Sequence, residues 1–385
     1  MKIGIDNEWY DLTKWARYHP GGERILERFD GHNATEHFYS LHSKKAVEQL
    51  KRMRPVDAKE SVPEESKIDQ AFRELRQQLK RDGWWERQYF WEFSLIGAIF
   101  AMVIAGTMLS YTHPIVAILL LSVAMQQAGW LGHDFVHGRD VPLHTALTRV
   151  VTGWINGFHR SWWSEKHNTH HVLTNHAQHD PDIDMQPVLF LWAPIKAVDH
   201  HLRKYQHYYF PLLYCLIYVS WRWQSLLWSL NRRDWNTFLF SQLPGYVWLA
   251  MMPWYVSLGS VLFGGFLVAL VVTLSHETEE IVTGRITSFA ENQFVCTKNI
   301  ECPDWITEYL FGGMQYQLEH HLFPTLPRYK YRLLVPIVKQ WARNNGLEYK
   351  AAPLTDMLVE HYQFLKKNGQ LAARKDKVDK YAFQP

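Results

Sequence analysis

Cysteine is scarce in this sequence, and the few cysteines present form no recognisable pattern. The 385 residues include only Cys215, Cys296 and Cys302, and none of them lies in a C-x-x-C spacing. This usage argues against a disulfide framework, a cysteine zinc site and a dithiol redox motif, and it fits a reducing compartment. Residues 1–90 contain no apolar signal-peptide core, so we expect no secretory leader.

The sequence also lacks a strong charge of either sign. The net charge of +3 is too small to suggest a nucleic-acid partner. There is no internal repeat and no low-complexity tract, and 15% aromatic residues provide ample material for a core, which excludes a disordered chain. The mean hydropathy of −0.27 argues against a chain composed mostly of transmembrane helices, although it allows a few.

Composition divides the chain into three parts. Residues 1–53 form a small polar module, and residues 54–88 contain a linker followed by an amphipathic helix predicted over 69–82. The remainder, residues 89–385, carries long apolar runs and is expected to be a membrane domain. An aromatic cluster at residues 84–91 precedes the first run, as is typical of a membrane interface.

The apolar runs predict about four transmembrane helices in a mainly α protein. They cover residues 93–111, 114–131, 237–258 and 260–275, and each pair forms a hairpin, with the second pair separated near Ser257 and Gly259. Segment 208–221 is expected to lie in the interface, and the alternative is that it spans while a later segment is re-entrant. Lysine and arginine on the histidine-rich side favour a cytosolic position for that side.

Histidine is the residue in excess. Of 21 histidines, seven lie in three short segments next to apolar runs: HDFVH, HNTHH and QLEHH, which contain His133, His137, His167, His170, His171, His320 and His321. Spacings of three and four residues place each set on one helical face. Seven imidazoles are too many for one tetrahedral zinc, so two metal ions fit the number better. His276 could be an eighth ligand or a helix cap.

Several polar residues near these histidines are candidates to orient them. Asp134, Asp180, Asp182 and Glu319 are carboxylates that could accept imidazole N–H groups, and Gln317 could be either a ligand or a hydrogen-bonding neighbour. Asp180 and Asp182 flank Pro181, so a simple loop turn is an equally good interpretation for them.

The three segments resemble the histidine boxes of membrane fatty-acyl desaturases. The glutamine that opens the third box is similar to the front-end subfamily, which carries a fused cytochrome b5 domain. The likeness extends through WWSEKHNTHH, DPDID and EHHLFPTLPR. It implies that the seven box histidines, and less directly His276, bind two non-haem iron ions on the cytosolic side of the endoplasmic reticulum membrane.

The amino-terminal module resembles cytochrome b5, a small α+β domain. WYDLTKWARYHPGG and the later FYSLHS match the two haem-ligand segments, which implies His19 and His42 as axial ligands; the module is shorter at its start than the family pattern. His32 and His37 lie near His42 but do not hold the matching position. A bis-histidine haem has no open coordination site and therefore transfers electrons.

Together the two resemblances imply O2-dependent front-end desaturation of a fatty acyl chain carried by CoA or a lipid. Electrons would come from NADH through a cytochrome b5 reductase and the fused haem b. Alternatives that share the boxes are a sphingolipid long-chain-base desaturase and a fatty acyl hydroxylase. A non-enzymatic alternative is an inactive haem-binding membrane scaffold, which the presence of all seven box histidines disfavours.

Overall fold

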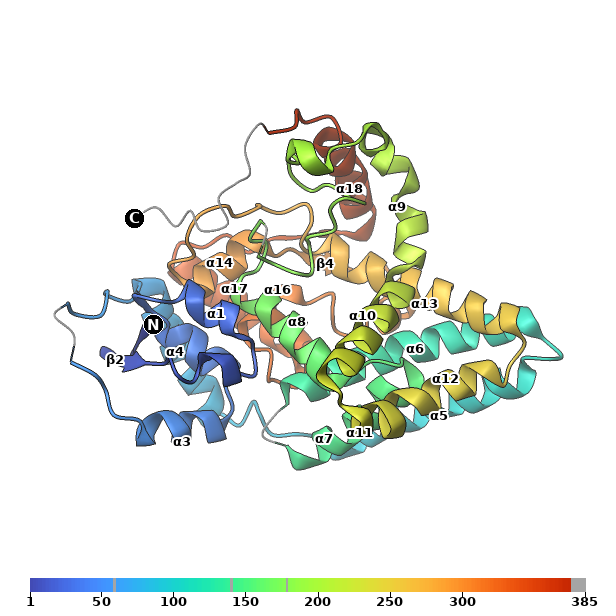
Figure 1. Ribbon diagram of the computed structural model, residues 1–385, viewed down its shortest axis with the longest axis horizontal. Coiled ribbons are helices and arrows are strands. Elements are labelled where there is room, and N and C mark those ends of the chain that lie inside the picture. Colours follow the sequence, from blue (N-terminus) through green and yellow to red (C-terminus); the bar gives the residue numbers. More distant parts are fainter. Residues whose placement is uncertain (58–59, 139–140, 178, 375–385) are drawn as a thin grey trace.

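The computed structural model of the chain describes residues 1–57, 60–138, 141–177 and 179–374. Within these ranges the chain is mainly helical and has two small sheets. The amino-terminal module lies at one end of the molecule, and a group of long helices extends to the other end (Figure 1). The histidine-bearing segments lie between them, in a cap over the base of the long helices.

The module is built around a three-stranded sheet in the order β2-β1-β3. β1 (Lys2–Ile5) pairs antiparallel with β2 (Glu8–Asp11) and parallel with β3 (His32–Asn33). Asp6 and Asn7 join β1 to β2 with φ of 53° and 63°, the left-handed pair that a tight hairpin requires. The helices of the module surround the haem-ligand candidates: η1 (Ala16–Tyr18), α1 (Glu23–Arg28), α2 (Thr35–Leu41) and α3 (Lys44–Arg52).

The segment that follows the module packs back onto it. The indole of Trp9 donates to the carbonyl of Glu60 at 2.8 Å, and the amide of Asn33 donates to that of Pro63 at 2.8 Å. The expected amphipathic helix is confirmed as α4 (Lys67–Arg81), which Ser66 caps by accepting from the backbone N–H of Asp69. The apolar stripe of α4 is buried, as its sequence pattern predicted.

Three helices in the described part of the chain are long and apolar enough to cross a membrane: α5 (Tyr89–Leu109), α6 (Pro114–His137) and α13 (Trp254–Leu274). α5 and α6 confirm the first expected hairpin, and Pro114 begins α6 where its missing N–H has no cost. α6 continues six residues beyond the predicted run and so carries the first histidine box within the same helix. Thus His133 and His137 are held by a membrane helix.

The second expected hairpin has different helix bounds in the structure. Instead of a break near Ser257 and Gly259, α13 runs unbroken from Trp254, and the break falls at 251–253, because Pro253 cannot continue the preceding helix. Before the break, the predicted span 237–258 is replaced by a shorter rod of three successive pieces, α11 (Trp235–Thr237), the π-helix η5 (Phe238–Gln242) and α12 (Leu243–Ala250). The described residues therefore contain three helices of full spanning length, and the fourth expected span is a shorter, broken helix.

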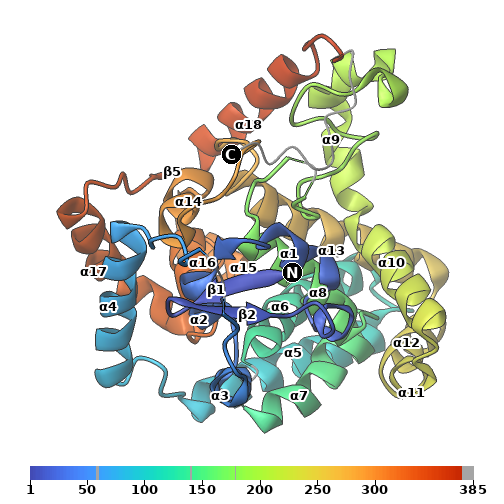
Figure 2. The same cartoon turned by 60° about the vertical axis from the view of Figure 1, so that its left-hand side comes forward.

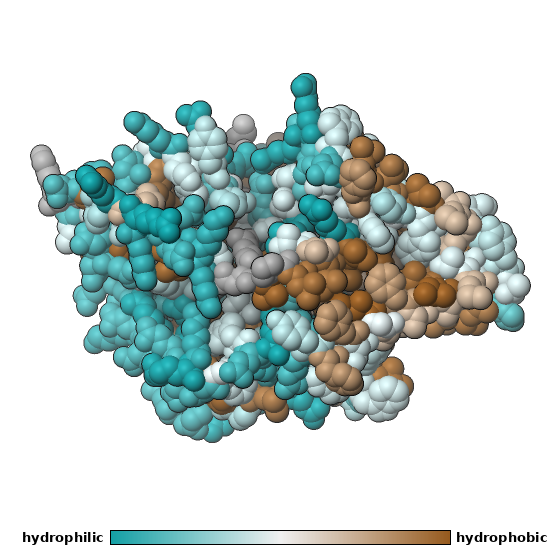
Figure 3. Space-filling view, turned by 90° about the horizontal axis from the view of Figure 1, so that it is seen from below, coloured by the Kyte–Doolittle hydropathy of each residue, from teal (hydrophilic) through white to brown (hydrophobic). Residues whose placement is uncertain are grey.

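Both hairpin turns lie at the same end of the molecule. The hydroxyl of Tyr111, after α5, donates to the carbonyl of Met251 at 3.0 Å, and the indole of Trp248 donates to Thr107 Oγ1 at 3.0 Å. In Figure 1, α5, α6, α12 and α13 extend together toward this tip. Figure 3 shows brown, apolar surface over the same half and teal, polar surface over the half that contains the module. This distribution is that of a multi-pass membrane domain with a polar cap.

The predicted interfacial segment 208–221 divides into two helices at Leu216: α9 (Gln206–Cys215) and α10 (Ile217–Arg232). Both pack on α13, and apolar side chains such as Tyr208, Leu212 and Trp223 remain exposed on their outer face. Short helices precede them: α7 (Pro142–Thr148), the π-helix η2 (Arg149–Ile155), α8 (Arg160–Val172), and the 3₁₀-helices η3 (Lys196–Val198) and η4 (His201–Tyr205).

The carboxyl-terminal third completes the cap. A second sheet pairs β4 (Asn299–Glu301) parallel with β5 (Ala351–Pro353). The helices of this part are α14 (Phe289–Cys296), α15 (Trp305–Phe311), α16 (Gln317–Leu322), η6 (Arg328–Lys330), α17 (Tyr331–Asn344) and α18 (Leu354–Asn368). α16 carries the third histidine box and packs against α14 and α17. Figure 2 shows the module in front of this cap.

Candidate metal centre

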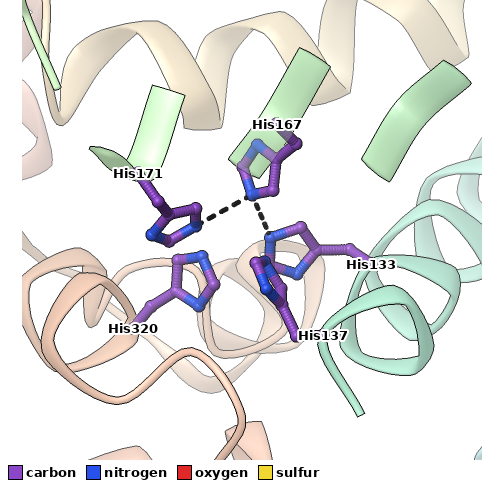
Figure 4. A group of neighbouring side chains, drawn as sticks. All are labelled: His133, His137, His167, His171 and His320. Atoms are coloured by element: carbon purple, nitrogen blue, oxygen red, sulfur yellow. Dashed lines mark hydrogen bonds between the residues drawn. The ribbon is translucent and has the colours of Figure 1, made fainter. Parts of the chain in front are cut away.

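Five histidines converge in the cap. They come from three helices: His133 and His137 from the end of α6, His167 and His171 from α8, and His320 from α16. One ring nitrogen of each lies within 4.8 Å of those of the other four, and all five side chains are buried. Figure 4 shows the rings turned toward a common centre. Spacings of four residues on α6 and α8 explain how two helices each present a pair.

A second group of three lies beside the first. His170 comes from α8, His276 from the residues that follow α13, and His321 from α16, and their ring nitrogens again lie within 4.8 Å of one another. Adjacent histidines on α8 and α16 thus face different groups, because neighbours on a helix point about 100° apart. The structure brings all eight histidines proposed from the sequence into two adjoining sets.

His159 fixes the start of α8. It caps the helix by accepting from the backbone N–H of Ser161 at 3.0 Å, and its other ring nitrogen lies 2.9 Å from a carboxylate oxygen of Asp234.

The approach of α16 to α6 depends on glycine. α16 follows the pair Gly312 and Gly313, both at positive φ, and a side chain at Gly312 would meet Trp130 of α6 at 2.7 Å. Glycine is therefore required for the third box to approach α6.

Hydrogen bonds fix the orientation of the imidazoles in the second group. His170 Nδ1 donates to Asp180 at 2.7 Å, His321 Nδ1 donates to Gln293 Oε1 at 2.9 Å, and His276 Nδ1 donates to the carbonyl of Cys296 at 3.1 Å. Each ring is thereby oriented with Nε2 as the nitrogen left for a further ligand. The Nε2 atoms of His170 and His321 are 3.3 Å apart in a buried site.

The first group repeats this arrangement. His167 Nδ1 donates to Asp182 at 3.2 Å, and its Nε2 lies 2.8 Å from His133 Nε2 and 3.1 Å from His171 Nε2. His320 Nδ1 donates to the hydroxyl of Tyr331 at 3.2 Å, and its Nε2 is buried without a hydrogen-bond partner among the described residues. In both groups buried imidazole nitrogens lie within 4.8 Å of one another, and such a set of nitrogen donors fits a metal ion.

The charge states of the cap histidines agree with this interpretation. Burial lowers the pKa of His167 to about 3, although Asp182 opposes the shift, and burial lowers the pKa values of His320 and His321 well below the usual range. For His170, burial again acts to lower the pKa, but the carboxylate of Asp180 outweighs it and raises the pKa. Three of these four rings are therefore neutral at physiological pH, the form that binds a metal.

The other polar residues proposed from the sequence have different places. Gln317 contacts the second group, since its Nε2 donates to His276 Nε2 at 2.9 Å. Asp134 lies 3.7 Å from His133 Nδ1, too far for a hydrogen bond, and pairs with Arg328 at 3.1 Å. Glu319 does not contact a box histidine among the bonds of the described residues; it accepts from Asn299 and Tyr349 at 2.6 and 2.7 Å, and so fixes α16 to its neighbours.

Three orienting groups were missed by sequence reasoning: Gln293, Tyr331 and the carbonyl of Cys296. None of them lies in a histidine box, and each reaches the site because α14, α17 and α16 pack together. An amide, a phenol and a backbone carbonyl have no sequence pattern in common. Only the tertiary structure could identify them.

The two haem-ligand candidates face each other in the module. The ring centroids of His19 and His42 are 5.9 Å apart and the rings are inclined by 28°. His19 Nδ1 donates to the carbonyl of Gly22 at 3.0 Å and His42 Nδ1 to that of Phe38 at 3.1 Å, so each lone pair is on Nε2. This pair fits a haem iron held from both faces. His37 instead packs between Phe29 and Phe289, away from such a site.

A cavity of about 480 Å³ borders both histidine groups. His133, His167, His170, His276 and Gln317 form one wall of it. Most of the remaining lining is apolar or aromatic and comes from α6, α10, α13 and the loop 181–189. A long apolar ligand could therefore lie directly against the metal-binding side chains.

Comparison with known proteins gives matches over most of the chain. Residues 109–353 match the family described as fatty acid desaturase, and residues 3–78 match the cytochrome b5-like heme/steroid binding domain. Similar proteins include a Delta(6)-fatty-acid desaturase, fat-3, of Caenorhabditis elegans (29% identical, 95% of this chain and 96% of the relative). A Delta(8)-fatty-acid desaturase of Euglena gracilis is 31% identical over 90% of both chains, and fatty acid desaturase 3 of Bos taurus is 29% identical over 95% and 90%.

Proposed function

Because the chain belongs to the fatty acid desaturase family, we propose that it inserts a double bond into a fatty acyl chain, between an existing double bond and the carboxyl end. The fused cytochrome b5 domain and the Delta(6) and Delta(8) desaturases among its relatives support the front-end type. The chain is an O2-dependent oxidoreductase of the membrane. Electrons are proposed to come from NADH through a separate cytochrome b5 reductase.

The convergence of eight imidazoles in two adjoining groups carries this proposal. We assign His133, His137, His167, His171 and His320 to one iron ion and His170, His276 and His321 to the other, with Gln317 beside His276. When bound there, the iron pair supplies the activation of O2 that removal of hydrogen from an unactivated methylene requires. Acid–base groups alone cannot remove that hydrogen, because the carbon is not acidic.

The chain's own residues orient the ligands. Asp180 and Asp182 accept the Nδ1 protons of His170 and His167, and so keep Nε2 turned toward the metal. Asp180 also accepts from the backbone N–H groups of Asn175 and Asp182, at 2.9 and 2.8 Å, which fixes its own position. Gln293 and Tyr331 have the same orienting role for His321 and His320.

The cavity is proposed to hold the acyl chain. Its apolar lining includes Trp130, Phe158 and Tyr218, and excludes water from the reacting carbons. The loop 181–189 and the helices α9 and α10 also line the cavity, and both helices carry exposed apolar side chains. A lipid substrate can therefore enter from the membrane interface.

We also propose four membrane crossings, by α5, α6, the broken rod α11–α12, and α13. The support is the contact between the two hairpin turns, through Tyr111 and Met251, which places both at one end. An even number of crossings keeps all histidine groups and the haem module on one side of the membrane. The basic residues on that side favour the cytosol, with the endoplasmic reticulum as the membrane.

The domain division stays as proposed from the sequence: a haem module at 1–53, a connecting segment at 54–88 and the desaturase domain at 89–385. His19 and His42 are the proposed axial ligands of haem b. The packing of residues 60–63 onto the module shows that part of the connecting segment is docked rather than extended.

The test is expression in a host that makes no polyunsaturated lipids, with fatty acids of defined length and unsaturation supplied. We expect one substrate class to gain a new double bond on the carboxyl side of an existing one, located by mass spectrometry. The matched control is the His170→Ala variant, which should give no product. A hydroxylated product, a desaturated sphingoid base, or no product from any substrate would each contradict front-end fatty acyl desaturation.

A further inference from the structure

The helix that carries the second histidine box ends inside the core of the haem module. Val172 and Leu173 directly follow His170 and His171, and they are 6% and 5% exposed. They belong to the same buried cluster as the module's own core residues, such as Ile3, Leu12 and Leu26. A metal-bearing helix and the haem module therefore share one hydrophobic core.

Polar contacts surround this shared core on two sides. On one side, Arg76 of α4 pairs with the buried Glu36 of α2 at 2.7 Å and donates to the carbonyl of Tyr39 at 2.6 Å. On the other, Arg28 of α1 lies 3.1 Å from His179, in the loop that continues toward Asp180 and Asp182. The buried ion pair between Arg76 and Glu36 holds the module against the connecting helix α4.

The haem-ligand loop itself faces α8. A side-chain carbon at Gly22 would lie 3.6 Å from Glu165 Oε1, and Gly22 accepts the Nδ1 proton of the axial-ligand candidate His19. Glu165 precedes the metal-ligand candidate His167 by two residues on the same helix. The haem-ligand loop of the proposed function therefore lies next to the helix that carries the second histidine box.

We propose that Val172 and Leu173 hold the haem module in a fixed seat on α8, so that electrons pass from the haem to the metal centre of the same chain without release of the module. This rests on the proposed function. Each transfer oxidises the haem by one electron and reduces the metal centre by one electron, and the NADH-dependent reductase restores the haem. Trp15 and Tyr18, which lie just before His19, are 41% and 69% exposed, so this side of the ligand loop stays open to the reductase.

Proteolytic cleavage of the connecting segment tests, independently of activity, whether the haem module stays bound to the rest of the protein. A protease site is placed within residues 57–60 of the full-length protein, membranes are cleaved and washed, and haem absorbance is measured in the pellet and the wash. We expect most of the haem to stay in the pellet. Haem that leaves with the wash from the otherwise unchanged protein would overturn the proposal.

A substitution then tests the contribution of α8. Leu173→Asp introduces a carboxylate into the shared core, and we expect at least a several-fold larger share of haem in the wash. Leu202→Asp, at a leucine that is 55% exposed, is the matched control and should behave like the unchanged protein. Total haem in pellet and wash shows that the module has folded. Equal retention by Leu173→Asp and Leu202→Asp would contradict the role of α8.

The electron route is tested by co-expression of two full-length variants in one membrane. One carries His42→Ala and lacks a haem ligand, and the other carries His170→Ala and lacks a metal ligand. We expect the pair to make no more product than either variant alone, with the haem spectrum of His170→Ala intact. Product near half the unchanged level would show transfer between chains and overturn the proposal. If the unchanged protein makes no product, the proposed function fails instead, while the retention result still stands.

Discussion

The haem module and the candidate metal centre, which under the proposed function both hold iron with histidine, do so in opposite ways. In the module, His19 and His42 are half-buried, and each donates to a backbone carbonyl within four residues of itself. In the cap, the eight histidines are at most 7% exposed, and side chains from other segments, such as Asp180 and Gln293, orient them. Local orientation suffices where the site must stay accessible, whereas a buried site requires the whole tertiary structure.

The difference follows from the two tasks. An electron carrier must be reached by a separate reductase, so part of its surface has to remain exposed. A centre that activates O2 beside an acyl chain has to exclude water, and the cavity of about 480 Å³ is accordingly lined mostly by apolar side chains. Exposure therefore separates the site proposed to receive electrons from the site proposed to use them.

The largest expected effect comes from removing one imidazole of the buried centre. His320→Ala leaves the Nε2 atoms of His133, His167 and His171 without one of their partners, and we expect iron content to fall sharply and product to reach background. The haem absorbance should be unchanged, because α16, which carries His320, contributes no residue to the buried cluster of the module. Elemental analysis of purified protein and a haem spectrum check both. The reciprocal variant His42→Ala should lose haem and keep non-haem iron. Loss of both haem and non-haem iron in either variant would contradict the comparison.

A smaller effect is expected when an orienting group is changed and the ligands stay. In Asp180→Asn the amide can no longer accept as strongly from His170 Nδ1, and we expect iron affinity or activity to fall roughly 10- to 100-fold. Asp199→Asn, which breaks only an ion pair with Arg203, is the control and should change neither. Iron affinity is measured by titration with a chelator. An unchanged affinity in Asp180→Asn would mean that orientation of His170 does not depend on this carboxylate.

The same contrast explains what could be predicted from the sequence. The box histidines and the haem-ligand candidates lie in short segments with fixed spacing, so pattern alone selected these ten as candidates, and the structure brings each set together. Asp180 and Asp182 were found because they lie close in sequence to α8. Gln293 and Tyr331 were not, because they reach the histidines only through packing of α14 and α17.

Membrane helices show a second limit of pattern reading. Apolar runs predicted α5 and α6 closely, but the second hairpin turns at Pro253 rather than near Gly259. A glycine within a helix can serve close packing instead of a turn: a side chain at Gly259 would meet Ile118 of α6 at 2.8 Å. Hydropathy does not distinguish these two uses of glycine.

The cavity borders the candidate metal centre, so a change within it should leave the haem module untouched. A side chain at Gly129 of α6 would lie 3.0 Å from the hydroxyl of Tyr218, and Leu there would narrow the cavity beside His133. We expect Gly129→Leu to shift the products toward shorter acyl chains, with haem reduction by NADH unchanged. Gly97→Leu is the control, because a side chain at Gly97 meets nothing within 4 Å. An unchanged chain-length profile would place the acyl chain elsewhere.

The smallest expected effect concerns the boundary between the two regions, where His37 of the module packs on Phe289 of the cap. Burial lowers the pKa of His37 to about 4, against the opposing charge of Asp69, so the folded state holds this ring neutral. Because the unfolded chain takes up a proton on this ring more readily than the folded protein does, the free energy of unfolding is highest above about pH 6.5. It falls as the pH falls toward 4. At pH 5 the loss is up to about 2 kcal/mol. In urea unfolding followed by haem absorbance, the unfolding free energy of the unchanged protein should fall more steeply from pH 7.5 to 5 than that of His37→Phe. An equal pH dependence in the two proteins would mean that His37 is not buried at this boundary.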